Sequence, residues 1–410
     1  MGGQMRIGQR WFAVWTIMIG LLLGHPVPAQ QGGASWAETV AAAEGQTVFF
    51  NAWGGSDRIN RYIGWVADRV ADQYGITLEH VRISDAADTV ARVLAERVAG
   101  RTSGGSVDLI WINGENFAAM KAADLLGAPF VADLPNFSLV DTVGKPTTLV
   151  DFTVPTDGLE SPWGMAQLVF LYDAANLPSP PRNPDALLDY AVTHPGRVTY
   201  PLPPQFHGTT LLKQLLIGLV DDPNRLQSPA GDAADVARVT APLWAYLDAL
   251  HPHLWRRGEA FPPSGQSLLQ LLDDGEIDIA FSFNPGEASA AIAAGQLAPT
   301  VRTYVFDGGT IGNTHFVAIP FNAPARAGAM VVANFLLSPE AQARKEDPSH
   351  WGDPTVLDLG RLTLDDRALF DALPVGQATL SADALSPTLL EPHPSWVAVI
   401  EAEWQRRYGS

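Results

Sequence analysis

Two strand-to-helix turns in separate halves of the chain constrain its fold more than any other feature of the sequence. The first is Val48–Ser56 (VFFNAWGGS), and the second is Ser282–Glu287 (SFNPGE). Each follows a short apolar run, ends in small and polar residues and precedes an amphipathic stretch. Such turns occur at the carboxyl ends of strands in open α/β sheets, where ligands collect. Two of them so far apart predict two lobes with a binding cleft between them.

The spacing of apolar residues predicts alternating strands and helices along the chain. Thr47–Trp53 is β-rich and apolar, and the helix after it should end at Gly75, since glycine adopts the left-handed conformation that closes a helix. Strands that alternate with helices indicate parallel βαβ units. We also expect strands at Leu78–Ile83, Val107–Ile112, Met165–Tyr172, Arg197–Leu202 and Ile277–Phe283, and helices at 209–220 (after a loop at Pro203–Gly208), 236–250 and 323–337.

The chain is expected to cross between the lobes twice. Prolines and glycines interrupt the periodicity in Asp151–Gly164, and Thr303–Pro320 is typical of a return crossing. The tail after Trp351 contains prolines and predicts only short helices. We therefore assign residues 44–160 and 305–345 to the first lobe, and residues 161–304 and 346–410 to the second.

The N-terminal segment is typical of a secretory signal peptide. Arg6 and Arg10 precede the apolar stretch Trp11–Gly24, and Val27–Ala29 resembles a cleavage site for residues 1–29. An uncleaved N-terminal anchor is the alternative. The chain has no cysteine, which excludes a disulfide framework, a thiolate metal site and a lipid anchor on cysteine. We therefore expect a protein free in the periplasm.

The net charge argues against nucleic-acid and membrane partners. It is −18 for the whole chain and becomes −20 without the signal peptide, which carries two arginines and no acidic residue. Phosphate backbones and anionic lipids attract basic surfaces, not acidic ones. The acidic balance is explained most simply by solubility.

Aromatic and acidic side chains stand where ligands of such a fold would bind. Trp53, Trp111 and Trp163 lie at strand ends or at the crossing, where aromatic faces can hold sugars, heterocycles or organic cations. Packing in the core is the alternative for each tryptophan. Carboxylates occupy the same kind of position, with helix capping or solvation as the alternative: Asp57, Glu115, Glu160 and Glu287.

Two further turns expose polar groups at expected helix starts. Trp111–Asn116 (WINGEN) offers amides, a carboxylate and backbone N–H groups, and Gln205–Thr210 (QFHGTT) offers hydroxyls and a glycine that permits close approach. A helix N-terminus can hold hydroxyls or an anion. Simple capping of each helix is an equally good interpretation.

Enzyme signatures are absent from the sequence. It has no nucleophile elbow, no Walker A loop, no His-Glu-x-x-His motif and no dinucleotide fingerprint. His251 and His253 flank Pro252 and make no convincing metal set. We expect neither catalytic activity nor a metal or cofactor. A glycosidase-like hydrolase with two distant carboxylates is the alternative, because such a pair need not be close in sequence.

Several segments resemble a known family. Thr310–Pro320 and Ala333–Gln342, with its FLLSPEAQ run, resemble extracytoplasmic solute-binding proteins of ABC importers. Phe50–Asn60, Asp108–Phe117 and Asp157–Met165 resemble the YnjB-like branch of that superfamily. The resemblance implies a two-lobe periplasmic-binding-protein type II α/β fold, in which each lobe is a mostly parallel sheet flanked by helices and a hinge joins the two.

The resemblance also implies a function and a set of site residues. The expected protein is a monomer that closes around one small solute and delivers it to an ABC permease, and a ligand sensor for a membrane receptor is a further alternative. Iron-binding relatives have adjacent tyrosines, which this sequence lacks. An aromatic and acidic cleft favours an organic cation, such as thiamine or a polyamine, or a sugar. The implied ligand-binding residues are Asn51, Trp53, Gly54, Trp111, Asn113, Gly114, Glu115, Asn116, Trp163, Phe206, Gly208, Thr209, Asn284 and Glu287.

Overall fold

The computed structural model describes residues 1–2 and 35–409. The predicted signal peptide lies, apart from its first two residues, outside the described residues. From Trp36 onward the chain forms one compact unit, which contains two large hydrophobic cores. In the part of the chain that is described, no helix is both long enough and apolar enough to span a bilayer.

The first lobe is built on a sheet in which parallel and antiparallel pairs are mixed. The strands β2, β1 and β3 are parallel neighbours, and β10 then pairs antiparallel with β3 and with β6. The short β11 pairs parallel with the first residues of β10. The bounds are β1 (Thr47–Trp53), β2 (Thr77–Ile83), β3 (Leu109–Ile112), β6 (Glu160–Gln167), β10 (Thr310–Ala318) and β11 (Thr388–Leu389); β4 (Val150–Asp151) and β5 (Val154–Pro155) form a separate hairpin.

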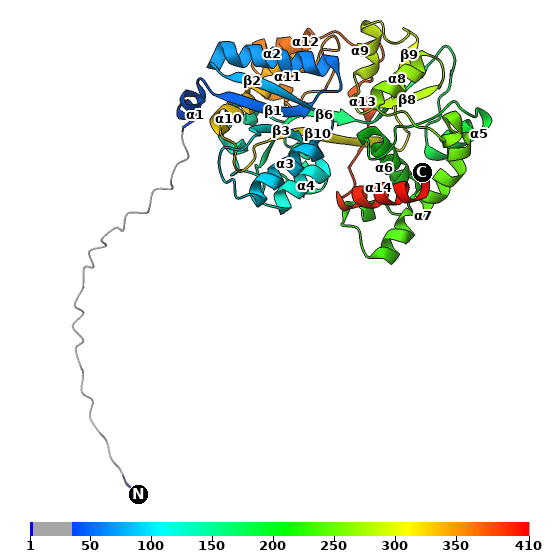
Figure 1. Cartoon of the computed structure of the whole chain (residues 1–410), viewed down its shortest axis with the longest axis horizontal. Helices are drawn as coiled ribbons and strands as arrows, with labels where there is room; N and C mark the ends of the chain where they lie inside the picture. The colour runs from blue at the N-terminus through cyan, green and yellow to red at the C-terminus, as the bar shows by residue number, and fades with distance from the viewer. Residues whose placement is uncertain (3–34, 410) are drawn as a thin grey trace. The chain divides into compact units, whose positions relative to one another are not determined.

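Helices cover both faces of this sheet. In Figure 1, α2 and α11 lie on one face and α3 and α4 on the other. The helix α2 buries the predicted stripe that includes Ile63, Val66 and Val70. It ends as predicted at Gly75, whose φ is 65°. The bounds are α1 (Trp36–Ala43), α2 (Asp57–Tyr74), α3 (Ala86–Val98), α4 (Gly114–Ala122), α10 (Arg326–Leu336), α11 (Pro339–Glu346) and α12 (Leu364–Asp371).

The second lobe has a smaller sheet, and its pairing corrects the prediction of a mostly parallel one. The central strand β7 pairs antiparallel with both β8 and β9. The strand β7 follows β6 almost directly, so the chain enters this lobe along a strand. The strands β8 and β9 each follow a helix and run in the opposite direction to β7. The bounds are β7 (Val169–Asp173), β8 (Ile279–Ser282), β9 (Val301–Tyr304), α5 (Pro184–Thr193), α6 (Phe206–Leu219), α7 (Ala233–Leu250), α8 (Gly265–Asp273), α9 (Glu287–Ala293), α13 (Ala382–Leu385) and α14 (Ser395–Tyr408).

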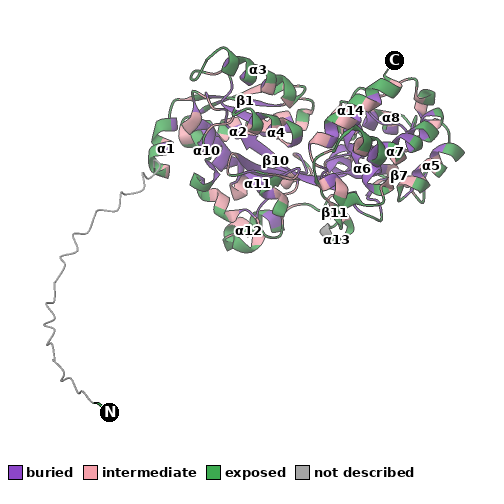
Figure 2. Ribbon diagram, turned by 90° about the horizontal axis from the view of Figure 1, so that it is seen from below, coloured by how far each residue is buried: buried purple, intermediate pink, exposed green. Residues whose placement is uncertain are grey.

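The paired strands β6 and β10 connect the two cores. On β6, Trp163 packs in the first lobe's core and Ala166 in the second lobe's core. On β10, Val317 packs in the first core and Ile311 in the second. Figure 2 shows the buried β10 running from the helices of one lobe to those of the other. The crossing predicted at Asp151–Gly164 is therefore in the right place, but its second half is a strand and not a loop.

Two further expectations are wrong. The segment Arg197–Leu202 forms no strand among the described residues and contributes only a single bridge, between Val198 and Ile279. The tail ends in α14, a helix of 14 residues.

The segment after α11 also departs from the assigned lobe limits. Trp351, Val356 and Phe370 pack in the core of the first lobe, although residues 346–410 were assigned to the second. Trp351 contacts Trp163 at 5.4 Å between ring centroids. The burial of apolar side chains against the first sheet therefore decides in which lobe this segment packs. Its position in the sequence did not indicate this.

Candidate functional site

A cavity of about 260 Å³ is lined by residues from both lobes. The first lobe contributes the carboxyl ends of β1, β2 and β3 together with the starts of the helices that follow them. The second lobe contributes the start of α6, the start of α8, the turn after β8 and one face of α14. This is the place where an open α/β sheet binds its ligand, and the volume suits a small solute.

Nine of the predicted site residues line this cavity. They come from two turns of the first lobe and two of the second, so the fold brings together segments that are more than 200 residues apart in sequence. The nine are Trp53, Trp111, Asn113, Glu115, Asn116, Phe206, Thr209, Asn284 and Glu287.

The other five predicted residues do not line the cavity. Trp163 is fully buried in the first core, with its ring 5.0 Å from that of Trp111. Asn51 is also fully buried, and its side chain donates to the Phe49 carbonyl at 3.4 Å. The remaining three are glycines that shape the turns: Gly54, Gly114 and Gly208.

The structure explains why glycine is required at two of these positions. A Cβ on Gly208 would lie 2.0 Å from the Pro201 carbonyl oxygen, so α6 can pack there only with glycine. Gly114 has a φ of 61°, and its N–H donates to the buried Asp151 carboxylate at 2.6 Å. Because glycine tolerates both close approach and positive φ, these positions set the direction of the turns that carry the lining side chains.

Aromatic rings form much of the first lobe's part of the wall. Trp53, Trp111 and Trp351 line the cavity, and Phe206 and Phe283 face it from the second lobe. The Trp111 ring lies 5.7 Å from that of Trp351. Rings held in contact this way bring large apolar faces to a ligand with little loss of side-chain entropy.

Two cations at the cavity are already neutralised by buried acids. Lys213 on α6 pairs with Glu391 at 2.6 Å, and both side chains are 2% exposed. Arg58 at the start of α2 pairs with Glu287 at the start of α9. Because burial opposes ionisation, it raises the pKa of Glu391 even though Lys213 and Asn313 act in the other direction.

The carboxylates that remain face the cavity without ion-pair partners in the described part of the chain. They are Asp85, Glu115 and Glu401. Burial raises the pKa of Glu115; the nearby Lys213 lowers it, and the nearby Glu391 and Asp85 raise it. Burial raises the pKa of Glu401 to about 7, although its Oε1 accepts a hydrogen bond from Thr209 at 2.7 Å. The site therefore carries acids whose repulsion a bound cation would relieve.

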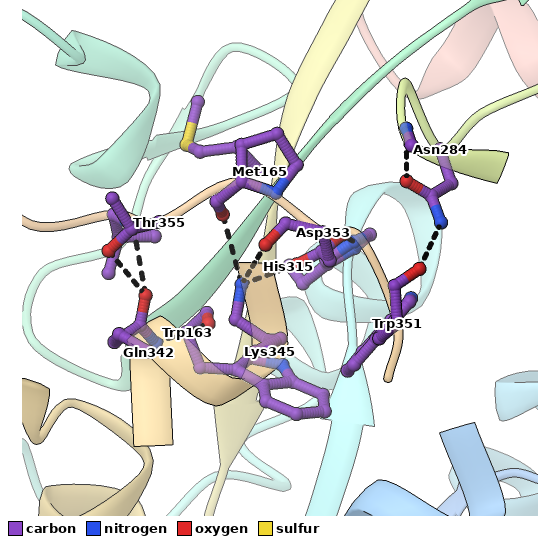
Figure 3. Close-up of polar contacts among 12 residues, drawn as sticks. Trp163, Met165, Asn284, His315, Gln342, Lys345, Trp351, Asp353 and Thr355 are labelled. Atoms are coloured by element: carbon purple, nitrogen blue, oxygen red, sulfur yellow. Dashed lines mark hydrogen bonds and ion pairs between the residues drawn. The ribbon is translucent and has the colours of Figure 1, made fainter. Parts of the chain in front are cut away.

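Three contacts join the lobes beside the cavity. The Arg58–Glu287 ion pair links α2 to α9, with each side chain 11% exposed. The Asn284 side-chain amide donates to the Trp351 carbonyl at 3.2 Å, as Figure 3 shows. A Cβ on Gly286 would lie 2.3 Å from the Gly352 carbonyl oxygen, so the two backbones touch. In the described state the turn after β8 and the start of α9 therefore touch the first lobe beside the cavity.

Several lining residues escaped the sequence analysis. Lys213 and Glu401 sit inside helical stretches that give no sign of facing a ligand, and the tail was expected to hold only short helices. His315 lies on the return strand. Burial lowers the pKa of another, His207, to about 4, so it is neutral near pH 7. The QFHGTT turn could have indicated His207, because it directly precedes two residues that were predicted.

Comparison with known proteins identifies the family. The family of bacterial extracellular solute-binding proteins matches residues 65–346, more than half of the chain. Protein YnjB of Escherichia coli (strain K12) is 50% identical over 377 residues, which cover 92% of this chain and 95% of YnjB. The chain therefore belongs to the bacterial extracellular solute-binding proteins, and the predicted function as a solute-binding component of an ABC transporter is confirmed.

Solved structures confirm the two-lobe α/β fold. A protein from Listeria monocytogenes described as a spermidine/putrescine ABC transporter has a TM-score of 0.61 and 16% identity, covering 88% of this chain and 98% of its own. The periplasmic binding protein AfuA from Actinobacillus pleuropneumoniae, solved with fructose-6-phosphate, has a TM-score of 0.59 and 14% identity, covering 89% and 99%. At these identities the similarity shows the fold and leaves the solute open.

Proposed function

We propose that this protein captures a small organic cation, such as thiamine or a polyamine, and delivers it unchanged to an ABC permease. One observation carries the proposal. Once the buried ion pairs are set aside, the carboxyl groups left at the cavity without an ion-pair partner among the described residues are Asp85 and Glu115 from the first lobe and Glu401 from the second. A cation between these walls attracts both, so it binds the closed state more tightly than the open one.

A sugar is the second candidate. The rings of Trp53 and Trp111 are platforms for the apolar face of a sugar, and the side-chain amides of Asn113 and Asn116 can bind hydroxyls. The carboxylates would then accept hydrogen bonds from further hydroxyls. A sugar needs no positive charge, so replacing a carboxylate by an amide would affect it much less than it affects a cation.

We further propose that the protein acts as a monomer in the periplasm, after removal of residues 1–29. The sequence of that segment supports export, with Arg6 and Arg10 before an apolar stretch. Native mass spectrometry of Gln30–Ser410, purified without refolding, tests the monomer and the solute together. A retained molecule with the mass of an organic amine supports the proposal, and a retained sugar favours the second candidate.

Thermal unfolding with thiamine, spermidine and maltose as probes extends this test. A solute present at one hundred times its dissociation constant stabilises the folded state by about 2.7 kcal/mol. We expect a shift with at least one cation. A protein that none of the three stabilises and that carries no solute after purification would contradict the proposal. Hydrolysis of a glycoside in the same samples would instead support the glycosidase-like alternative.

Variants of the cavity acids test the charge argument directly. Glu115→Gln and Glu401→Gln should each weaken cation binding about tenfold or more, because a hydrogen bond to a charged group contributes about 1.5–3 kcal/mol. The matched control is Glu403→Gln, which removes an acid from the same helix as Glu401. Glu403 pairs instead with Arg406 and Arg407, outside the cavity lining. Equal binding by all three variants would exclude the cation.

A further inference from the structure

His315 occupies an unusual position on the return strand. The register between β10 and β6 shifts between His315 and Phe316, and this irregularity turns the strand beside the cavity. The imidazole lines the cavity, and its Nε2 lies at hydrogen-bond distance, 2.9 Å, from Oδ1 of Asp353.

A buried lysine fixes the state of Asp353. Nζ of Lys345 lies 2.5 Å from Oδ2 of Asp353 and also donates to the carbonyls of Asp353 and Pro354, at 3.1 and 2.9 Å. Figure 3 shows Lys345 and His315 on the same carboxylate. Burial alone would raise the pKa of Asp353, but the contacts with Lys345 and His315 outweigh it and lower that pKa. Asp353 is therefore an ionised acceptor.

This arrangement determines which nitrogen of His315 carries the proton. A carboxylate can only accept, so Nε2 must donate its hydrogen to Asp353. The charge of Asp353 is already balanced by Lys345, and both of these side chains are at most 1% exposed. Because Nε2 carries the hydrogen, the lone pair of the neutral ring is on Nδ1.

The surroundings of the ring leave only one edge for the cavity. A Cβ on Gly164 would lie 2.7 Å from Cδ2 of His315, so the Cδ2–Nε2 edge faces the protein. The Trp351 ring lies nearly parallel to the imidazole, at 19° and 6.2 Å, and the Trp111 ring meets it edge-on at 5.2 Å. Nδ1 makes no hydrogen bond to any described residue.

We propose that Nδ1 of His315 is a fixed hydrogen-bond acceptor that selects solutes presenting an N–H or O–H group beside Trp111 and Trp351. Lys345 and Asp353 are positioning residues, because they set the tautomer without touching the solute. The proposal rests on the cavity being the solute site, but it holds for an amine and for a sugar alike. It disfavours solutes that would place a phosphate or carboxylate oxygen at this point.

Nitrogen-15 NMR of histidine-labelled protein without solute tests the tautomer. We expect His315, assigned by its absence in His315→Phe, to show a protonated Nε2 and an unprotonated Nδ1 at neutral pH. In Lys345→Met the carboxylate loses its cation, so the imidazole should take a second proton. An Nδ1–H tautomer or an imidazolium in the wild type would overturn the proposal. If Lys345→Met does not fold, the wild-type spectrum still decides.

Binding of thiamine, spermidine and maltose tests the selection. For whichever probe binds the wild type, His315→Phe keeps a ring between the tryptophans but removes the acceptor, and we expect a loss of about tenfold. Lys345→Met should lose as much while retaining the histidine. Unchanged binding by His315→Phe, or a wild type that binds none of the three probes and retains no donor-bearing solute, would overturn the proposal. Loss in His315→Phe with no loss in Glu115→Gln and Glu401→Gln would reject the cation and keep the acceptor.

Discussion

The two walls of the cavity are held in place by different interactions. In the first lobe, Trp111 and Trp351 lie against the fully buried Trp163, so their rings are fixed by the core. In the second lobe, Lys213 and Glu401 are held by partners of opposite charge or by hydrogen bonds. The first wall therefore has a preformed shape, while the second wall depends on the balance of its charges. Preformed surfaces bind with a smaller loss of entropy.

The largest effect should come from breaking the buried ion pair of the second lobe. Lys213→Met leaves Glu391 buried without its cation, which should lower the free energy of unfolding by about 3–5 kcal/mol. Removing both charges in Lys213→Met with Glu391→Met should recover much of this loss. Urea denaturation of the wild type, the single variant and the double variant measures the free energy of unfolding of each. Equal stability of the single and double variants would show that Lys213 does not neutralise Glu391.

A large effect on binding, with little effect on folding, is expected at the first wall. Trp53→Ala removes a partly exposed ring from the lining, so the folded core is retained. Loss of one aromatic contact should weaken binding of a ring-bearing probe such as thiamine about twofold to tenfold, corresponding to about 0.5–1.5 kcal/mol. Titration calorimetry measures the effect on binding, and thermal unfolding measures the effect on stability. Wild-type affinity in Trp53→Ala would mean that the solute binds elsewhere.

The charge balance of the second wall should respond to pH. The pKa of Glu401 is about 7 in the folded protein, raised by burial from an ordinary value of 4.5. The folded state thus binds this proton more tightly than the unfolded chain. The contribution of Glu401 to stability is therefore full below about pH 4.5 and is lost as the pH rises toward 7. Glu401→Gln should unfold with a weaker pH dependence than wild type across this window, as measured by urea denaturation at several pH values. Parallel curves would contradict this assignment.

The smallest effect is expected from the contact between the lobes. Arg58→Ala removes the cross-lobe partner of Glu287 and should destabilise the closed state by about 1 kcal/mol, since each side chain keeps an exposed fraction of 11% and water can replace the lost partner. Small-angle scattering without solute should then show a larger radius of gyration. The control is Arg69→Ala, which removes a more exposed pair with Glu340 within the first lobe. The same radius in Arg58→Ala and wild type would show that this pair does not hold the lobes together.

Much of the fold follows from local sequence patterns. The strand Thr47–Trp53 and the helix that ends at Gly75 were predicted to within a residue, because a buried strand and a one-sided helix leave clear periodicities. The strands of the second lobe's sheet were predicted to be mostly parallel, but they pair antiparallel. Their relative direction depends on the strand β6, through which the chain enters this lobe. The helix α14 was not predicted at its full length, since it follows prolines in a mixed stretch.

The lining residues in turns after strands were predicted, and those inside helices were missed. Trp53, Glu115 and Asn284 follow strands directly, so their position at the sheet edge could be inferred. Trp163 has the same local signature, but the first core surrounds it. No local pattern distinguishes a tryptophan that faces a cavity from one that packs beneath it, because both are large apolar residues beside glycines in the sequence.

The sequence by itself determined the alternation of strands and helices, the two-lobe family and the turns that reach the cleft. These depend on residues close together in the chain, whose hydrogen bonding and burial follow from local spacing. The tertiary structure alone decided which charges are neutralised, since Lys213 meets Glu391 from 178 residues away. It also decided that His315 presents an acceptor, because that depends on Asp353 and Lys345 meeting the strand. Electrostatic interactions act through space, and only the folded chain fixes those distances.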